Sequence, residues 1–253
     1  MEDKGTVEIS INNEIGTITF GHPQSNSLPG ALLQLLANTI TDLSKEASVK
    51  VIILQSLGDK TFCAGASFDE LVAISDLETG KTFFSGFANV INACRKSSKL
   101  IIGRIQGKAV GGGVGIASAV DYCFATTNAA IKLSELAVGI GPFVVGPAVQ
   151  RKIGLSAMSE LAINATSWRS AEWAMQKGLY NEIYETSSEM DSAIQSLAHK
   201  LSNSNPAAMQ ELKQVFWEGT EDWDTLLVSR ASISGKLVLS DFTREAISTF
   251  KNR

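Results

Sequence analysis

The sequence predicts an α/β fold, because helices and strands alternate over the first two-thirds of the chain. Residues 51–54 and 100–106 are short apolar runs, the pattern of strands that are covered on both faces. Helical patterns follow them, over about 80–96 and from the glycines at 111–113 to about 120, and residues 122–125 return as a strand. Such alternation is typical of an α/β core.

A β-hairpin and a helix precede this core. Apolar and polar residues alternate over 7–11 and again over 15–20, so we expect two antiparallel strands joined by a short turn. Ser27 followed by Pro29 predicts the start of a helix. Apolar side chains then recur on one face of that helix up to about residue 47.

The last third of the chain is predicted to be helical. From about Ser156 the strand patterns fade, and no low-complexity linker separates this part from the core. We therefore expect a helical appendage packed on the core. Its amphipathic stretches are 156–164, 170–177, 187–201, 206–217 and 222–238, followed by a short helix over 241–250.

Composition excludes several classes of function. The net charge of -4 and the scattered Lys and Arg argue against a nucleic-acid partner. Cys63, Cys94 and Cys123 form no CxxC pair, and His22 and His199 are the only histidines, so we expect no metal site and a reducing compartment. Because no apolar run resembles a signal peptide or crosses a bilayer, we expect a cytoplasmic protein without a membrane partner.

A glycine run marks the first candidate site. In the stretch Ile105–Ala117, a strand leads into three glycines at 111–113, where a helix begins. Free N–H groups at a helix N-terminus carry partial positive charge, and glycine lets a substrate oxygen approach them closely. The run alone fits equally well a tight turn that binds nothing. It matches neither a dinucleotide fingerprint, since Ser118 takes the last glycine position, nor a Walker A loop, since Ala109 follows Gly107-Lys108.

A loop of small residues is the second candidate. Residues 58–67 are predicted to form a loop between a buried strand and a helix, and the segment Thr61–Leu71 contains Cys63-Ala-Gly-Ala66. Such a loop can present a second backbone N–H, and two converging N–H groups make an oxyanion hole. Taken alone, the segment fits a surface turn better.

Glu135 is the third candidate, because it lies in the otherwise apolar stretch Leu133–Phe143. A carboxylate in apolar surroundings should have a raised pKa and be suited to proton transfer. The alternatives are a solvated side chain on a loop, or one paired with Lys132 or Arg151.

In this order and spacing, the segments resemble the crotonase superfamily, the enoyl-CoA hydratase/isomerase family, over nearly the whole chain. The resemblance rests on six segments together: Asn26-Ser27-Leu28, Phe62–Ala66, Gly107–Gly113, Leu133–Pro142, Ser170-Ala171-Glu172 with Gly178-Leu179, and Asp241–Phe250.

The resemblance implies a fold and an assembly. We expect a crotonase-like α/β spiral of repeated β-β-α units over residues 1–195. Residues 196–253 would form a C-terminal helical trimerisation region. The assembly that the resemblance implies is a homotrimer, or a hexamer made of two trimers.

The resemblance also implies roles for individual residues. The backbone N–H groups of Ala66 and Gly112 would form the oxyanion hole for a thioester carbonyl, with Glu135 as acid/base. Coenzyme A would bind as part of an acyl-CoA substrate, with no separate cofactor. The expected contacts with coenzyme A are Asn26, Leu28, Lys60, Ala64 and Phe250, and those with the acyl chain are Phe68, Leu71, Phe84, Phe87 and Phe143.

One departure from the family pattern leaves the reaction open. Hydratases of the family commonly carry a second glutamate two residues after the glycine run, where this chain has Gly115. Hydration of a 2-enoyl-CoA, possibly branched as in methylglutaconyl-CoA, is slightly favoured. A single glutamate is also enough to move a double bond between positions 3 and 2, and the segment Ile140–Phe143 resembles such isomerases. A catalytically impaired acyl-CoA-binding protein, or a decarboxylase or hydrolase of acyl-CoA, are further alternatives.

Overall fold

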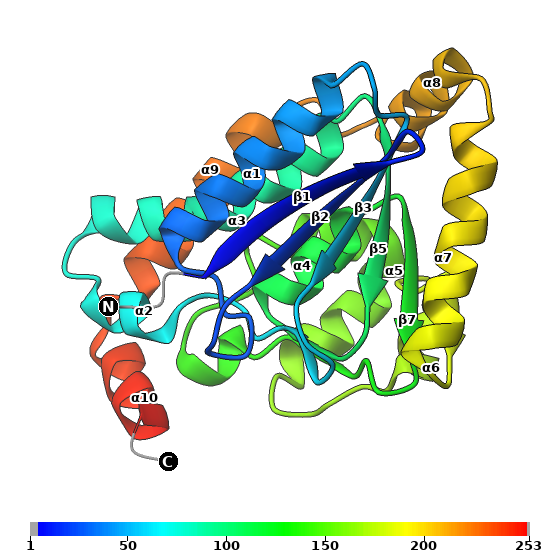
Figure 1. The fold of residues 1–253 in the computed structure, drawn as a ribbon. Helices are drawn as coiled ribbons and strands as arrows, with labels where there is room; N and C mark the ends of the chain where they lie inside the picture. The colour runs from blue at the N-terminus through cyan, green and yellow to red at the C-terminus, as the bar shows by residue number, and fades with distance from the viewer. Residues whose placement is uncertain (1–4, 252–253) are drawn as a thin grey trace.

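A computed structural model describes residues 5–251, without the side chains of residues 248, 250 and 251 (Figure 1). Its main sheet has six strands in the order β1-β2-β3-β5-β7-β9. The first pair is antiparallel and forms the expected hairpin, and the other neighbours are parallel. The strands are β1 (Thr6–Asn12), β2 (Ile15–Gly21), β3 (Val51–Ser56), β5 (Leu100–Ile105), β7 (Tyr122–Thr126) and β9 (Glu182–Tyr184).

A second, smaller sheet contains three parallel strands, β4 (Thr61–Cys63), β6 (Lys108–Val110) and β8 (Ile131–Lys132). The expectation of a loop throughout 58–67 is therefore wrong at β4. Strands of two or three residues are too short to show a periodic pattern.

The two sheets are built by a repeating unit. Each of the pairs β3-β4, β5-β6 and β7-β8 gives its first strand to the large sheet and its second strand to the small one. Helices follow each pair: α2 (Phe68–Ala73) and α3 (Leu77–Lys96), α4 (Gly112–Ala119), and α5 (Gly146–Ile163). The predicted spiral of β-β-α units is confirmed.

Helix α1 (Gly30–Lys45) has an unexpected N-terminal cap. The predicted start at Ser27 is wrong, because Pro29 occupies the cap position and makes no side-chain cap bond. Glu70 on α2 supplies the missing acceptor, since its Oε2 lies 2.7 Å from the backbone nitrogen of Gly30. A carboxylate there also complements the positive end of the helix dipole.

The C-terminal part is helical as predicted, with α6 (Ala171–Gln176), α7 (Ser187–Ser202), α8 (Pro206–Phe216), α9 (Trp223–Leu237) and α10 (Asp241–Lys251). Two details differ. Helix α5 begins at Gly146 and not near 156, because Gly154, at φ 76°, interrupts its pattern. Strand β9 was missed, being only three residues long. The expected boundary after residue 195 falls within α7 and stays a prediction.

Helices cover both faces of the large sheet (Figure 1). Helix α7 lies along one face, where Met190, Ile194 and Ala198 are buried against a cluster that includes Ile102 and Phe124. The main core occupies the other face, beneath α1, α3, α4 and α5. No helix in the described range 5–251 has the length and apolar character that a membrane span needs.

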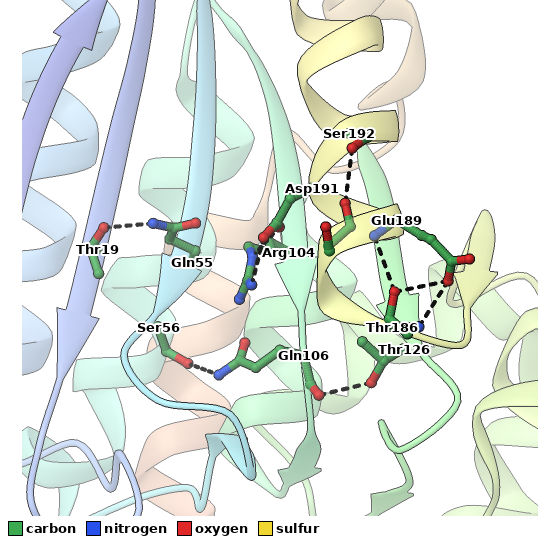
Figure 2. A network of polar contacts seen from close by, with 11 residues as sticks. Thr19, Gln55, Ser56, Arg104, Gln106, Thr126, Thr186, Glu189, Asp191 and Ser192 are labelled. Carbon is green, nitrogen blue, oxygen red and sulfur yellow. Dashed lines mark hydrogen bonds and ion pairs between the residues drawn. The ribbon is translucent and has the colours of Figure 1, made fainter.

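Polar side chains tie the carboxyl ends of the central strands together (Figure 2). Gln106 donates from Nε2 to Ser56 Oγ at 2.9 Å, and Thr126 Oγ1 donates to the Gln106 carbonyl at 2.8 Å. On α7, Asp191 pairs with Arg104 through two hydrogen bonds. These contacts fix the points from which the chain passes into β4, β6 and β8.

A buried ion pair holds α8 against the core. The Nζ atom of Lys213 lies 2.7 Å from Asp121 Oδ2 and donates to the Lys99 carbonyl at 2.9 Å. The indole of Trp217 donates to the other oxygen of Asp121 at 3.1 Å. Both charged groups are therefore fully compensated although they are almost entirely buried.

Candidate active site

The backbone around Ala66 forms its hydrogen bonds with Leu28, which lies on one side of this loop. The N–H of Leu28 donates to the Gly65 carbonyl at 2.8 Å, and the N–H of Ser67 donates to the Leu28 carbonyl at 3.3 Å. Because these bonds flank Ala66 in a parallel bridge, its own N–H points away from Leu28. Within the described part of the chain this N–H donates to no protein acceptor. Gly65, at φ 93°, supplies the backbone turn that an L-residue rarely adopts.

The second free N–H belongs to Gly112, the first residue of α4. Gly111 precedes it at φ 52° and donates to the Lys132 carbonyl at 2.9 Å. Residues 5–251 offer the Gly112 N–H no acceptor of their own. A Cβ atom on Gly112 would lie 2.1 Å from the Phe87 ring, so only glycine fits here.

The segment around Ala66 lies close to the glycine run at 111–113. A Cβ atom on Gly65 would lie 3.7 Å from the Gly112 nitrogen, and one on Gly113 would lie 2.6 Å from the Cys63 carbonyl oxygen. The backbone segments that carry the free N–H groups of Ala66 and Gly112 therefore lie close together, and both residues line the same cavity. Two such donors in a largely water-free site can stabilise an oxygen that gains negative charge.

Glu135 places its carboxyl group beside these donors. It begins the short 3-10 helix η1 (Glu135–Val138), and its Oε1 would lie 3.0 Å from a Cβ on Gly111. Its Oε2 is buried and has no hydrogen-bond partner among the described residues. Burial raises the pKa of Glu135 to about 7.

The two alternative partners of Glu135 point elsewhere. No salt bridge in the described range involves Glu135. The ammonium group of Lys132 lies 4.6 Å from the centre of the Trp168 ring, and the guanidinium group of Arg151 lies 4.3 Å from that of Trp217. The interpretation of Glu135 as an unpaired carboxyl group in apolar surroundings agrees with this geometry.

A cavity of about 480 Å³ opens in front of Ala66, Gly112 and Glu135. Among its lining residues in the described range, Glu135 is the only carboxylate and Lys132 the only cation. The remaining wall is largely apolar. All five residues predicted to contact an acyl chain line this cavity, which we call the acyl cavity after that prediction: Phe68, Leu71, Phe84, Phe87 and Phe143.

A second cavity, of about 650 Å³, contains two of the positions predicted to contact coenzyme A, Asn26 and Lys60. The Asn26 amide donates to the carbonyls of Leu57 at 2.7 Å and Thr61 at 2.9 Å, so this side chain shapes the cavity wall.

The other predicted contacts lie apart from this second cavity. Ala64 lines the acyl cavity, and Leu28 is fully buried behind the loop. Phe250 is on α10, and its side chain lies outside the described part of the structure.

The position of the second glutamate has no space for a side chain. A Cβ atom on Gly115 would lie 2.5 Å from Val145 Cγ1 and 3.7 Å from Ile91 Cδ1. The nearby acids of α2 are engaged elsewhere, because Glu70 caps α1 and Asp69 accepts a hydrogen bond from Gln24.

Sequence reasoning missed several residues of the acyl cavity. Val145, which packs on Gly115, also lines the cavity, as do Ala165 and Thr166 from the turn after α5. Pro142 and the Gly146-Pro147 pair could have indicated an earlier helix start near Val145. We found no sequence signal for Ala165 and Thr166.

Comparison with known proteins shows which sequences and structures this chain is similar to. The family model described as "Enoyl-CoA hydratase/isomerase" matches residues 10–250. A short-chain-enoyl-CoA hydratase from Clostridium acetobutylicum is 27% identical over 94% of this chain and 91% of its own length. The mitochondrial methylglutaconyl-CoA hydratase of Homo sapiens is 31% identical over 87% of this chain and 63% of its own length. The solved structure of an enoyl-CoA hydratase from Bacillus halodurans superimposes with a TM-score of 0.88 at 23% identity, over 96% of this chain and 99% of that one.

Proposed function

Since this chain belongs to the enoyl-CoA hydratase/isomerase family of the crotonase superfamily, we propose that it hydrates a 2-enoyl-CoA with Glu135 as its single acid–base residue. The observation that carries the proposal is the unpaired Glu135 carboxyl group, which lies beside two free N–H groups at the apolar cavity. Coenzyme A enters only as part of the substrate.

The oxyanion hole comes first in the proposed mechanism. The N–H groups of Ala66 and Gly112 bind the thioester oxygen, which gains negative charge as water adds to the β-carbon. Removing one such donor typically costs about 10²–10³ in kcat. Because both donors are backbone groups fixed by a bridge and a helix start, they need no rearrangement during the reaction.

Glu135 accepts one proton and donates one proton in each turnover of the proposed reaction. One carboxyl oxygen accepts a proton from the attacking water, and the carboxyl group delivers a proton to the α-carbon of the enolate. The C–O bond forms at the β-carbon, the C=C bond becomes single, and one water is consumed. A pKa of about 7 suits both roles, since the group exchanges protons readily at neutral pH.

Isomerisation between 3-enoyl-CoA and 2-enoyl-CoA is the second candidate. The observation that favours it is the filled space at Gly115, where Val145 excludes a second carboxylate. One carboxyl group can take a proton from the α-carbon and return it to the γ-carbon while the oxyanion hole holds the dienolate.

Separate assays with a 2-enoyl-CoA and a 3-enoyl-CoA test the two reactions. Loss of the conjugated chromophore with the first shows hydration, and its appearance with the second shows isomerisation. Glu135→Gln should lower the responsible rate by about 10²–10⁴. The matched control is Glu211→Gln on the exposed face of α8, which should leave the rate unchanged.

Two results would contradict the proposal. An unchanged rate in Glu135→Gln would remove Glu135 from the chemistry. Tight acyl-CoA binding without turnover of either substrate would identify a catalytically impaired acyl-CoA-binding protein.

We further propose that the chain is cytoplasmic and that it assembles as a homotrimer or as a hexamer of two trimers. Large apolar side chains are exposed on α5 and α8, among them Leu155, Ile163, Leu212 and Phe216. Burial of such side chains between subunits would stabilise an assembly. Light scattering on the purified protein measures its mass, and a monomer at micromolar concentration would contradict the expectation.

A further inference from the structure

Two lysines lie over one tryptophan ring at the edge of the acyl cavity. The ammonium groups of Lys132 and Lys108 lie 4.6 Å and 5.1 Å from the centre of the Trp168 ring. No carboxylate lies within salt-bridge distance of either lysine in the described range 5–251. The residue Trp168 is 41% exposed, so the cluster is open to a ligand.

Backbone bonds join this cluster to the catalytic loop. Ile131 and Arg169 exchange two hydrogen bonds of 2.9 Å, which hold Trp168 beside Lys132. The Lys132 carbonyl accepts the bond from the Gly111 N–H, at the residue that precedes the oxyanion donor of α4. Lys132 therefore belongs to the wall of the cavity that Glu135 also lines.

The charges of the cluster are incompletely compensated. A cation over an exposed aromatic face gains only about 0.5–1 kcal/mol, and two cations on one ring repel each other. An anion that binds at these ammonium groups would reduce this repulsion and form charge-assisted hydrogen bonds. The cluster is thus arranged to receive a negative group.

The acyl group is the best source of that anion. The phosphates of coenzyme A are predicted to bind at the separate cavity that contains Asn26 and Lys60. Lys132, in contrast, lines the cavity with the catalytic carboxyl group. Resting on the proposed acyl-CoA function, we propose that Lys132, Lys108 and Trp168 form a subsite for a carboxylate on the acyl group, and that the substrates are coenzyme A monothioesters of dicarboxylic acids.

Binding of unreactive ligands tests the subsite without turnover. Glutaryl-CoA and pentanoyl-CoA have acyl chains of the same length, and only the first carries a terminal carboxylate. By calorimetry we expect the wild-type protein to bind glutaryl-CoA about tenfold or more tightly, as one charge-assisted hydrogen bond allows. Lys132→Met should abolish this preference and leave pentanoyl-CoA binding intact, which also shows that the variant is folded.

Two further variants sharpen the comparison. Lys108→Met should weaken the preference in part, since one ammonium group remains. Lys177→Met is the matched control, because Lys177 is an exposed lysine that lies over a different ring, that of Trp173, at 6.0 Å. It should retain the full preference for glutaryl-CoA.

Other results would overturn the inference. Equal affinity of the wild-type protein for glutaryl-CoA and pentanoyl-CoA would exclude a carboxylate subsite. An equal loss of affinity for both ligands and for free coenzyme A in Lys132→Met would assign the lysine to a phosphate. A failure of the proposed function can be told apart from a failure of the subsite. In that case neither 2-enoyl-CoA nor 3-enoyl-CoA would be turned over, while the preference for glutaryl-CoA would persist.

Discussion

The buried carboxyl group of Glu135 should make the stability of the protein depend on pH, and Glu135→Gln should remove that dependence. Burial raises the pKa of Glu135 from 4.5 to about 7 because the ionised form loses water and gains no partner in the described residues. Glutamine keeps nearly the same shape and never ionises. The substitution therefore isolates the cost of the buried charge.

The direction of the effect follows from proton binding. Between pH 4.5 and about 7 the native state holds the proton of Glu135 and the unfolded chain releases it. The free energy of unfolding therefore falls as the pH rises through this window. The full difference between the two pKa values corresponds to about 3 kcal/mol, reached above pH 7.

Urea unfolding of both proteins at pH 4 and at pH 8.5 measures this quantity. At pH 8.5, relative to pH 4, Glu135→Gln should gain about 3 kcal/mol over the wild-type protein. Comparing the two pH values cancels any constant difference between the amide and the neutral acid. A gain below about 1 kcal/mol would mean that water or a partner reaches the carboxyl group, and the reasoning for its raised pKa would be refuted.

Three further substitutions test other parts of the structure. Gly115→Glu should lower the free energy of unfolding by at least about 2 kcal/mol, measured by thermal unfolding. In the double variant with Val145→Gly, the loss should be smaller than the sum of the two single losses by more than about 1 kcal/mol, because the second change provides the missing space. Additive effects would show that the two positions do not compete. Gly112→Ala should lower kcat/KM by a factor of about 10² or more, because the new methyl group displaces the start of the helix that carries the oxyanion donor. Unchanged kinetics would contradict the assignment of Gly112 as a donor. Lys213→Met leaves the buried Asp121 unpaired and should cost about 3–5 kcal/mol in urea unfolding, whereas a cost below about 1 kcal/mol would show that the pair is hydrated.

The sequence was sufficient for the long elements and for the loops that meet at the site. The runs at 51–54 and 100–106 are buried strands because their apolar character is continuous, and helices α7, α8 and α10 show clear amphipathic patterns. Short strands such as β4, β8 and β9 have too few residues for any period to show. Their place is decided by pairing with distant segments.

The side-chain contacts of the site could be predicted only in part. The apolar neighbours of Glu135 predicted a raised pKa but left a solvated or paired carboxyl group open as alternatives, and only the structure shows that its Oε2 has no partner among the described residues. In contrast, the cap that Glu70 forms on α1 joins residues 40 positions apart, and the contact of Val145 with Gly115 joins the N-cap of α5 to helix α4. Neither contact leaves a local pattern, because each depends on how separate elements pack.

The bridge between Leu28 and Ala66 has a consequence for how the protein is studied. Both groups that would hold the thioester oxygen are peptide N–H groups, so exchanging the side chain at position 66 leaves the donor chemically in place. A conventional alanine scan is therefore blind to half of the oxyanion hole. Proline at position 66 would remove the donor, but it would also restrict the backbone. Replacing the Gly65–Ala66 amide by an ester through chemical ligation deletes the N–H while keeping every side chain, and it would expose the contribution of that donor.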